Sequence, residues 1–325
     1  MTRPLLEVED LRTYYFGDRG RRVTKAVDGV SLTLAAGETL GIVGESGSGK
    51  TTLALSLLRL LPPAARIVGG AIRFEGEDLL TKSDGEMRRI RGKRIAMILQ
   101  DPMASLNPLF TVGDQVAEPI RVHEGADRRA ARERARELLR SVKIAAPELR
   151  VREYPHQMSG GMRQRIVGAI AISCDPRLLI ADEPTTSLDL TIQAQYLGLL
   201  RELQRRHRLT LIFVTHNLGI VARMCDRVAV MYAGRVVETG PTKAIFDAAA
   251  HPYTKALIES IPKLSGARGR LTAIDGQPPD PAALPAGCAF HPRCPKVFER
   301  CRQEAPPELP AGEAHAARCW LLPPA

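Results

Sequence analysis

The chain has 325 residues, 44% of them hydrophobic and 25% charged, which is the composition of a globular protein and excludes a wholly disordered one. Its 46 Lys and Arg residues outnumber the 36 Asp and Glu residues, and the net charge of +10 would suit nucleic acid, an anionic membrane surface or simple solubility. Only 4% of the residues are aromatic and no basic run is interleaved with stacking residues, so we expect no nucleic-acid partner.

The N-terminal segment does not have the pattern of a secretory signal. Residues 1–4, Met-Thr-Arg-Pro, lead directly into a strand-like segment without an apolar stretch between them. No apolar run along the chain approaches the roughly 18 residues that a membrane-spanning helix needs. We therefore expect a soluble protein of the cytosol that reaches a membrane only through a partner.

Short strand-like segments alternate with helical patterns along the first 260 residues. Strands are predicted at residues 5–15, 30–34, 39–43, 95–99, 178–181, 210–214 and 228–231, with one more beginning at Ile72. This alternation predicts a largely parallel α/β core, and the polar helical pattern at about residues 101–160 predicts an inserted helical subdomain. Beyond about Ile261 the chain is rich in Pro, Gly and Cys. We therefore expect a domain at residues 1–260 and an extension at residues 261–325.

The segment Gly44–Thr51 fits G-x-x-x-x-G-K-[ST], the pattern of a phosphate-binding loop. Its glycines can take positive φ and carry no Cβ, so successive N–H groups can turn toward a phosphate. Lys50 supplies a point charge, and the Thr51 hydroxyl is a hard oxygen ligand for Mg²⁺. A predicted strand precedes the loop and a predicted helix follows it, adding the partial charge of a helix N-terminus. The expected nucleotide-binding residues are Gly44, Glu45, Ser46, Gly47, Ser48, Gly49, Lys50, Thr51 and Thr52.

A second acidic element follows the apolar strand at residues 178–181. Asp182 would complete the Mg²⁺ coordination, and Glu183 would face the attacking water as a general base or an orienting group. On its own, such a pair before Pro184 would more often cap a helix N-terminus. After a phosphate loop, the metal-site interpretation is the stronger one.

The segment Met158–Arg165, which reads Met-Ser-Gly-Gly-Met-Arg-Gln-Arg, resembles the signature turn of the ATP-binding subunits of ABC transporters. Further motifs of that family appear in the family's order: the Q-loop at Gln100, the D-loop at Ser187-Leu188-Asp189, the H-loop at His216, and an adenine-stacking aromatic at Tyr15, with Tyr14 and Phe16 as alternatives. The resemblance covers about residues 5–261. It implies a P-loop NTPase fold, with a RecA-like core, an antiparallel β-subdomain and a helical subdomain.

The resemblance also implies roles for these residues. Glu183, His216 and Gln100 would be catalytic, and Thr51, Gln100 and Asp182 would hold Mg²⁺. A lone His216 would more often be structural, but its place after an apolar strand and Thr215 favours contact with the γ-phosphate. Such domains dimerise head to tail, so one group would face the partner's ATP: Ser159, Gly160, Gly161, Met162, Gln164 and Asp189.

Two more segments resemble one branch of the family. Gln100–Pro108 is similar to the segment after the Q-loop in importers of dipeptides, oligopeptides and nickel. His251-Pro252-Tyr253-Thr254 is similar to the His-Pro-Tyr element that opens the C-terminal extension of that branch. Either could also reflect proline at a helix start. Their joint occurrence favours the importer branch.

The extension carries four of the six cysteines. Because disulfides are uncommon in the cytosol, clustered thiols indicate a metal site. Similar importer subunits hold a [4Fe–4S] cluster at matching cysteines, whereas His291 and His315 keep Zn²⁺ open as an alternative. Thiols without a metal are the third possibility. The expected ligands are Cys288, Cys294, Cys301 and Cys319.

Together these features predict the ATPase of a di- or oligopeptide importer, peripheral on the cytoplasmic face of the cell membrane. Its cofactors would be ATP, Mg²⁺ and the iron–sulfur cluster or zinc. Its partners would be a second ATP-binding subunit, either a paralogue or a second copy, two integral-membrane permeases and, indirectly, a solute-binding protein. The alternatives are an importer of nickel or another small solute, and a soluble ABC ATPase of iron–sulfur assembly, translation or repair.

Overall fold

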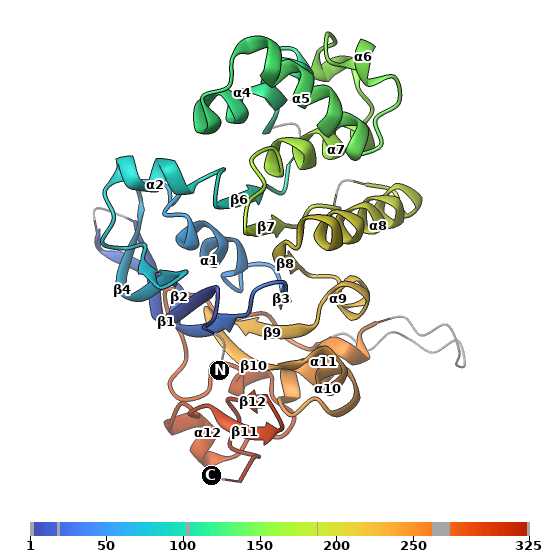
Figure 1. The fold of residues 1–325 in the computed structure, drawn as a ribbon. Coiled ribbons are helices and arrows are strands. Elements are labelled where there is room, and N and C mark those ends of the chain that lie inside the picture. Colours follow the sequence, from blue (N-terminus) through green and yellow to red (C-terminus); the bar gives the residue numbers. More distant parts are fainter. Residues whose placement is uncertain (1–2, 18–19, 102–104, 187, 262–273, 324–325) are drawn as a thin grey trace. The chain divides into compact units, whose positions relative to one another are not determined.

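The structure, a computed structural model, describes residues 3–17, 20–101, 105–186, 188–261 and 274–323. It divides into two compact units, one formed by Met1–Leu80 with Phe213–Ala325 and the other by Thr81–Ile212. Figure 1 shows the elements of both. Two stretches of the expected motifs lie outside the described residues: 102–104, after Gln100, and Ser187 of the D-loop.

The first unit contains an antiparallel sheet in the order β2-β1-β4-β5. Its strands are β1 (Leu6–Gly17), β2 (Arg22–Leu34), β4 (Ala65–Phe74) and β5 (Glu77–Asp78). Leu6 pairs with Leu34 on one side and with Phe74 on the other, and all three side chains are buried. This sheet is the antiparallel β-subdomain that the sequence predicted.

Strand β4 begins earlier than the sequence indicated. The apolar pattern predicted a start at Ile72, but the strand runs from Ala65 because β1 is long enough to pair with it back to Tyr15. Gly70 lies within it at φ +93, and a Cβ there would come within 2.6 Å of the backbone of Leu11. The close approach requires glycine, which interrupts the alternation that marks a strand.

The second sheet of this unit has the strand order β11-β12-β10-β9-β3. Every residue of β3 (Thr39–Val43) is buried, and the strand runs parallel to β9 (Arg227–Tyr232). The remaining strands, β10 (Arg235–Pro241), β11 (Leu309–Gly312) and β12 (His315–Ala317), are antiparallel to their neighbours. The helices of this unit are α1 (Lys50–Leu57), α9 (Leu218–Met224), α10 (Thr242–Ala248), α11 (Pro252–Glu259), η3 (His291–Arg293) and α12 (Glu299–Gln303).

The second unit contains β6 (Ile95–Ile98) parallel to β7 (Leu178–Asp182), and β8 (Thr210–Thr215) then carries the chain back into the first unit. Its helices are α2 (Asp84–Ile90), α4 (Val112–Glu124), α5 (Arg128–Ser141), α6 (Pro147–Arg150), η2 (Pro155–Gln157), α7 (Gly160–Ala171) and α8 (Leu190–His207). The insertion between β6 and β7 is helical, as expected. Parallel strands in both units confirm the predicted α/β class.

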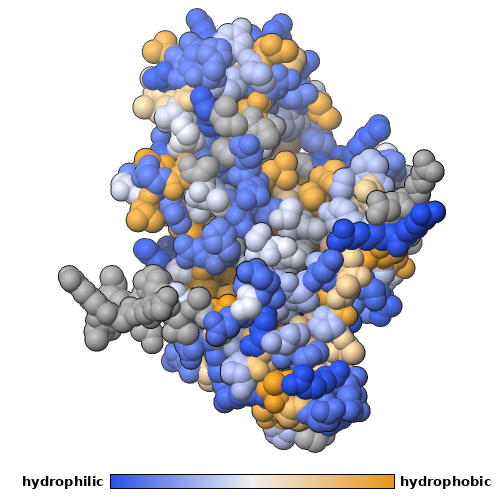
Figure 2. Space-filling model, turned by 180° about the vertical axis from the view of Figure 1, so that it is seen from behind, coloured by the Kyte–Doolittle hydropathy of each residue, from blue (hydrophilic) through white to orange (hydrophobic). Residues whose placement is uncertain are grey.

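Hydrophilic residues cover most of the face in Figure 2, with hydrophobic residues in small scattered groups. Across the described parts of the chain, no helix combines the length and apolar character that crossing a bilayer requires.

Candidate active site

The predicted phosphate loop joins buried β3 to helix α1. Gly47 and Gly49 have φ values of +79 and +101, which favour glycine. Gly49 is the N-cap residue of α1, and a Cβ at this position would lie 2.0 Å from the carbonyl oxygen of Ala26. The loop thus turns into the helix along a path that other residue types cannot follow.

Lys50 lies inside this loop. Its side chain is buried, and its Nζ donates hydrogen bonds to the carbonyl oxygens of Gly44 at 2.8 Å and Glu45 at 2.9 Å. The ammonium is thereby held at the start of α1, where the helix adds partial positive charge. Thr51, the expected Mg²⁺ ligand, is exposed beside it. This concentration of positive charge is suited to an anion.

Tyr15, the expected adenine-stacking residue, lies on β1. Its hydroxyl is 3.3 Å from the Thr52 hydroxyl in α1, so the structure brings it to the phosphate-loop helix. Of the two alternatives, Tyr14 donates a 2.6 Å hydrogen bond to Asp28, and burial with this bond raises the pKa of Tyr14 to about 12. Phe16 has the Arg66 guanidinium 5.9 Å from its ring centroid.

His216 also belongs to the first unit. It directly follows β8, and its side chain is exposed at the end of that buried strand. The next residue, Asn217, caps helix α9 by accepting hydrogen bonds from the N–H groups of Gly219 and Ile220. The strand end and the cap fix the backbone on both sides of His216.

The acidic pair and Gln100 lie in the second unit. Asp182 ends β7 with its side chain buried, and Glu183 follows at φ +45, an unfavourable conformation for this residue type. The Glu183 Oε2 accepts hydrogen bonds from Gln100 at 3.2 Å and from the Thr186 hydroxyl at 2.9 Å. The structure therefore joins two of the three expected catalytic residues. The alternative role as a helix cap is wrong for α8, which Asp189 caps.

The expected signature turn opens helix α7. Ser159 is its N-cap, and its hydroxyl accepts a 3.3 Å hydrogen bond from the N–H of Met162. A Cβ on Gly161 would lie 2.7 Å from the Ile192 side chain, whereas one on Gly160 would meet open space. Gln164 is buried within the unit. Ser159 and Gly160 are thus the exposed part of the helix terminus.

The four extension cysteines lie near one another. The Cys288 N–H donates a 2.9 Å hydrogen bond to the Cys301 carbonyl oxygen, and burial together with the three neighbouring thiols raises the Cys288 pKa to about 11. Thiols are suitable donors for iron or zinc. However, no three His, Cys, Asp or Glu side chains of the described residues are arranged as metal ligands. The expected metal site is therefore not confirmed.

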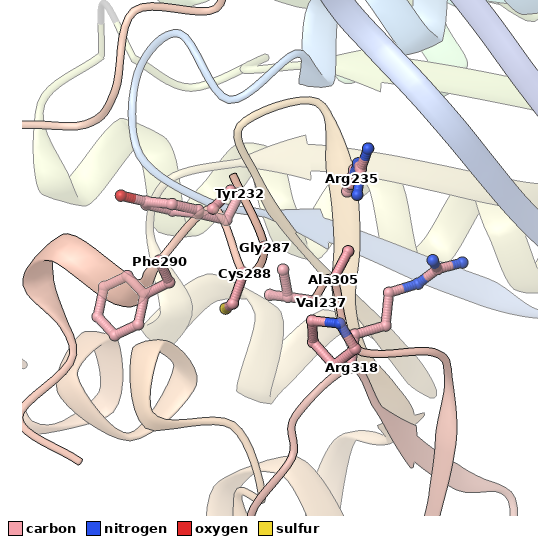
Figure 3. A pocket seen from close by; sticks show the side chains of 10 residues that line it. Tyr232, Arg235, Val237, Gly287, Cys288, Phe290, Ala305 and Arg318 are labelled. Atoms are coloured by element: carbon pink, nitrogen blue, oxygen red, sulfur yellow. The ribbon is translucent and has the colours of Figure 1, made fainter. Parts of the chain in front are cut away.

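Figure 3 shows Cys288 beside a small cavity between β9, β10 and the extension. Its volume is about 20 Å³, and Tyr232, Val237 and Phe290 are among the residues that line it. A space of this size holds about one water molecule, so it excludes a nucleotide. Cys174 and Cys225, outside this cluster, are buried core residues as predicted.

Two residues that contact the phosphate loop were missed in the sequence. Arg293 forms an ion pair with Glu45, and Tyr253 accepts a hydrogen bond from the Glu45 N–H. Tyr253 was noted only as part of the His-Pro-Tyr element, and no pattern around Arg293 indicated a contact. Both are more than 200 positions from Glu45 in the sequence.

Comparison with protein families gives two matches along the chain. The profile described as "ABC transporter" matches residues 27–186, and the one described as "Oligopeptide/dipeptide transporter, C-terminal region" matches residues 237–301. A probable peptide ABC transporter ATP-binding protein of Sinorhizobium fredii is 50% identical over 318 residues, covering 97% of this chain and 94% of that protein. A Brucella abortus protein with a provisional name as a peptide import ATP-binding protein is 49% identical, with coverages of 97% and 96%.

Solved structures of ATP-binding cassettes have a similar fold. One is a dimeric cassette in a post-hydrolysis state bound to ADP and phosphate, with a TM-score of 0.65 and 26% identity, covering 73% of this chain and 98% of that one. Another is a subunit of an ABC transporter complex of Clostridium perfringens, with a TM-score of 0.64, 28% identity and coverages of 76% and 92%.

Proposed function

We propose that this chain, which belongs to the ATP-binding proteins of ABC transporters, is the ATP-hydrolysing subunit of a membrane importer for di- and oligopeptides. The observation that carries the proposal is the 50% identity to a peptide transporter protein along 97% of the chain, including its C-terminal region. A soluble ABC ATPase is disfavoured because residues 237–301 match a region of oligopeptide and dipeptide transporters.

The nucleotide binds at the phosphate loop, with Tyr15 against the adenine and Lys50 at the β and γ phosphates. The buried ammonium at the start of α1 supports this assignment. Hydroxyl, amide and carboxylate oxygens are ligands that Mg²⁺ prefers, so Thr51, Gln100 and Asp182 are suited to hold it. The bound ion supplies positive charge that offsets the negative charge of the phosphates.

Glu183 orients the attacking water, and His216 contacts the γ-phosphate. The strained backbone of Glu183 and the two hydrogen bonds to its Oε2 hold the carboxylate in one orientation. Holding a catalytic group in this way lowers the entropy cost of reaching the transition state. The bond from Gln100 also links the carboxylate to the segment that leads into the helical subdomain.

Hydrolysis requires a second ATP-binding subunit, a paralogue or another copy of this chain. The exposed N-terminus of α7, at Ser159 and Gly160, is suited to bind the partner's nucleotide. Gly161, Met162, Gln164 and Asp189 complete the proposed signature and D-loop group.

Two permeases form the membrane part of the importer and receive solute from a solute-binding protein. Because ATP is available in the cytoplasm, this chain binds the permeases on the cytoplasmic face of the cell membrane. The proposed permease contact lies near Leu106–Pro108 in the helical subdomain, at about residues 101–160. Leu109 and Phe110 follow with exposed fractions of 80% and 54%. Adjacent exposed apolar side chains form a contiguous apolar surface, which is the kind of surface that marks protein contacts when it is large enough.

We place the extension at residues 261–325, after a domain of residues 1–260. We propose that its four cysteines bind a metal centre and that binding brings their side chains together, because the structure does not arrange them as metal ligands. A [4Fe–4S] cluster is favoured over Zn²⁺ because the candidate donors are four thiols. Anaerobic purification followed by metal analysis tests this assignment. About four iron atoms per chain are expected, and one zinc with no iron would contradict the cluster.

Uptake of a radiolabelled dipeptide by cells with and without the gene tests the importer function. Deletion should abolish uptake, the wild-type gene should restore it, and Glu183→Gln should not. Unchanged dipeptide uptake combined with a loss of nickel uptake would instead favour the nickel importer.

A further inference from the structure

A buried arginine of the C-terminal region holds the side chain of Glu45 in the phosphate loop. The Arg293 Nη1 and Nη2 atoms lie 2.7 Å and 3.0 Å from the two Glu45 carboxylate oxygens. The remaining donors of Arg293 bond to the carbonyl oxygens of Asp275 and Ile274 and to the Tyr232 hydroxyl. The Arg293 side chain is only 4% exposed. The Glu45 side chain is 27% exposed, so the pair is buried on the arginine side, and its bidentate geometry fixes the orientation of both partners.

A second contact holds the backbone of the same residue. The Glu45 N–H donates a 2.9 Å hydrogen bond to the Tyr253 hydroxyl, while the Gly44 carbonyl oxygen of the same peptide group accepts from the Lys50 Nζ. The peptide between Gly44 and Glu45 is therefore held from both sides. Rotation of this peptide would move the acceptor that positions the Lys50 ammonium.

An aromatic cluster makes this support rigid. The ring centroids of Tyr253 and Tyr232 are 4.6 Å apart, and Phe290 lies 5.4 Å from Tyr253 and 5.3 Å from Tyr232. All three side chains are fully buried. Such packing holds rings in fixed positions, so the Tyr253 hydroxyl is presented in one orientation.

The negative charge of Glu45 explains why the phosphate loop needs a positively charged partner beside this residue. A carboxylate in a phosphate-binding loop repels the phosphates and attracts the ammonium of Lys50, whose Nζ already contacts the Glu45 carbonyl oxygen. The Arg293 guanidinium neutralises that carboxylate and holds it at a fixed place. Without Arg293, the carboxylate would compete with ATP for Lys50.

We propose that Arg293 and Tyr253 are positioning residues for ATP binding, which hold Glu45 so that the phosphate loop and Lys50 are preorganised for the nucleotide. This inference rests on ATP binding at the phosphate loop. Both residues lie within residues 237–301, the part that matches the transporter C-terminal region. The C-terminal region thus contributes directly to the geometry of the nucleotide site.

Equilibrium binding of a fluorescent ATP analogue with Mg²⁺ to the purified full-length chain tests the proposal. Arg293→Met should raise the Kd about tenfold or more, as expected for loss of a charge-assisted hydrogen-bonded pair. Glu45→Gln should weaken binding less than Arg293→Met does, and the double variant should bind like Glu45→Gln because the repelling charge is gone. Tyr253→Phe should weaken binding about threefold, and Arg302→Ala, which changes an exposed arginine of the C-terminal extension, should have no effect.

If Arg293 had a purely structural role, the double variant would bind ATP as weakly as Arg293→Met does, and this result would overturn the proposal. Unchanged ATP binding by Arg293→Met would overturn it as well. Where Arg293→Met does not fold, Arg293→Gln, which keeps hydrogen-bond donors but carries no charge, gives the same comparison with and without Glu45→Gln. Failure of the wild-type chain to bind the analogue would instead refute the proposed nucleotide site.

Discussion

His251 should make the stability of the C-terminal region depend on pH. Its Nδ1 accepts a 3.0 Å hydrogen bond from the Tyr253 N–H and caps helix α11, and the backbone N–H of His251 donates a 2.9 Å bond to the Glu238 carboxylate. Its side chain is 1% exposed. Burial lowers the His251 pKa to about 4, so the native protein keeps the ring neutral. Protonation would remove the acceptor of the cap.

The expected size of the effect follows from this pKa. In the unfolded chain the histidine pKa returns to about 6.5, so between pH 6.5 and 4 the unfolded state binds a proton that the native state does not. Neutral His251 therefore makes its full contribution to the free energy of unfolding above pH 6.5, and this contribution is lost as the pH falls toward 4. At about 1.36 kcal/mol per pKa unit, about 3 kcal/mol is lost by pH 4 and about 2 kcal/mol by pH 5.

Urea unfolding of the full-length chain at pH 7 and pH 5, followed by the fluorescence of its single tryptophan, Trp320, measures this loss. The matched variant is His251→Asn, whose side-chain oxygen can cap the helix but does not titrate. The free energy of unfolding of the wild type, taken relative to His251→Asn, should fall by about 2 kcal/mol from pH 7 to pH 5. Taking this difference removes the effect on stability of the carboxylates that titrate in both proteins. A difference that stays constant between the two pH values would refute the reasoning.

Three further substitutions or reactions test other parts of the structure. Gly49→Ala should abolish ATP-analogue binding, because its Cβ would lie 2.0 Å from the Ala26 carbonyl oxygen, and wild-type affinity would contradict the loop geometry. Ser159→Ala removes the N-cap of α7 and should lower the free energy of unfolding by about 1 kcal/mol in urea titrations, whereas an unchanged value would exclude the cap. Cys225 is buried, and burial raises its pKa to about 12. After iodoacetamide treatment at pH 8, mass spectrometry should therefore show Cys225 unmodified in the native protein and modified in the denatured one. Rapid labelling of the native protein would refute its burial.

The local parts of the site could be predicted from the sequence because short segments carry their own geometry. The phosphate loop needs glycines at fixed positions between a strand and a helix, and this order is visible without a structure. The same holds for Asp182 and Glu183 at the end of an apolar strand and for Ser159 before a helix. Each of these arrangements involves residues close together in the chain.

The contact of Glu45 with Arg293 and Tyr253 could not be predicted, because folding joins positions 248 and 208 residues apart. Arg293 lies in a short 3-10 turn without hydrophobic periodicity, so nothing local indicates which partner it has. The start of β4 was missed for a related reason, since its pairing with β1 determines its length.

We expect this chain to hydrolyse ATP in an assembled transporter, with Glu183 as the catalytic carboxylate. The most direct measurement compares the steady-state ATPase rate and the ATP affinity of wild type and Glu183→Gln in the complex with its permeases. Glu183→Gln should lower the rate by a factor of at least about 10² while leaving ATP affinity close to that of the wild type. A rate near that of the wild type would contradict the role of Glu183 and the account built on it.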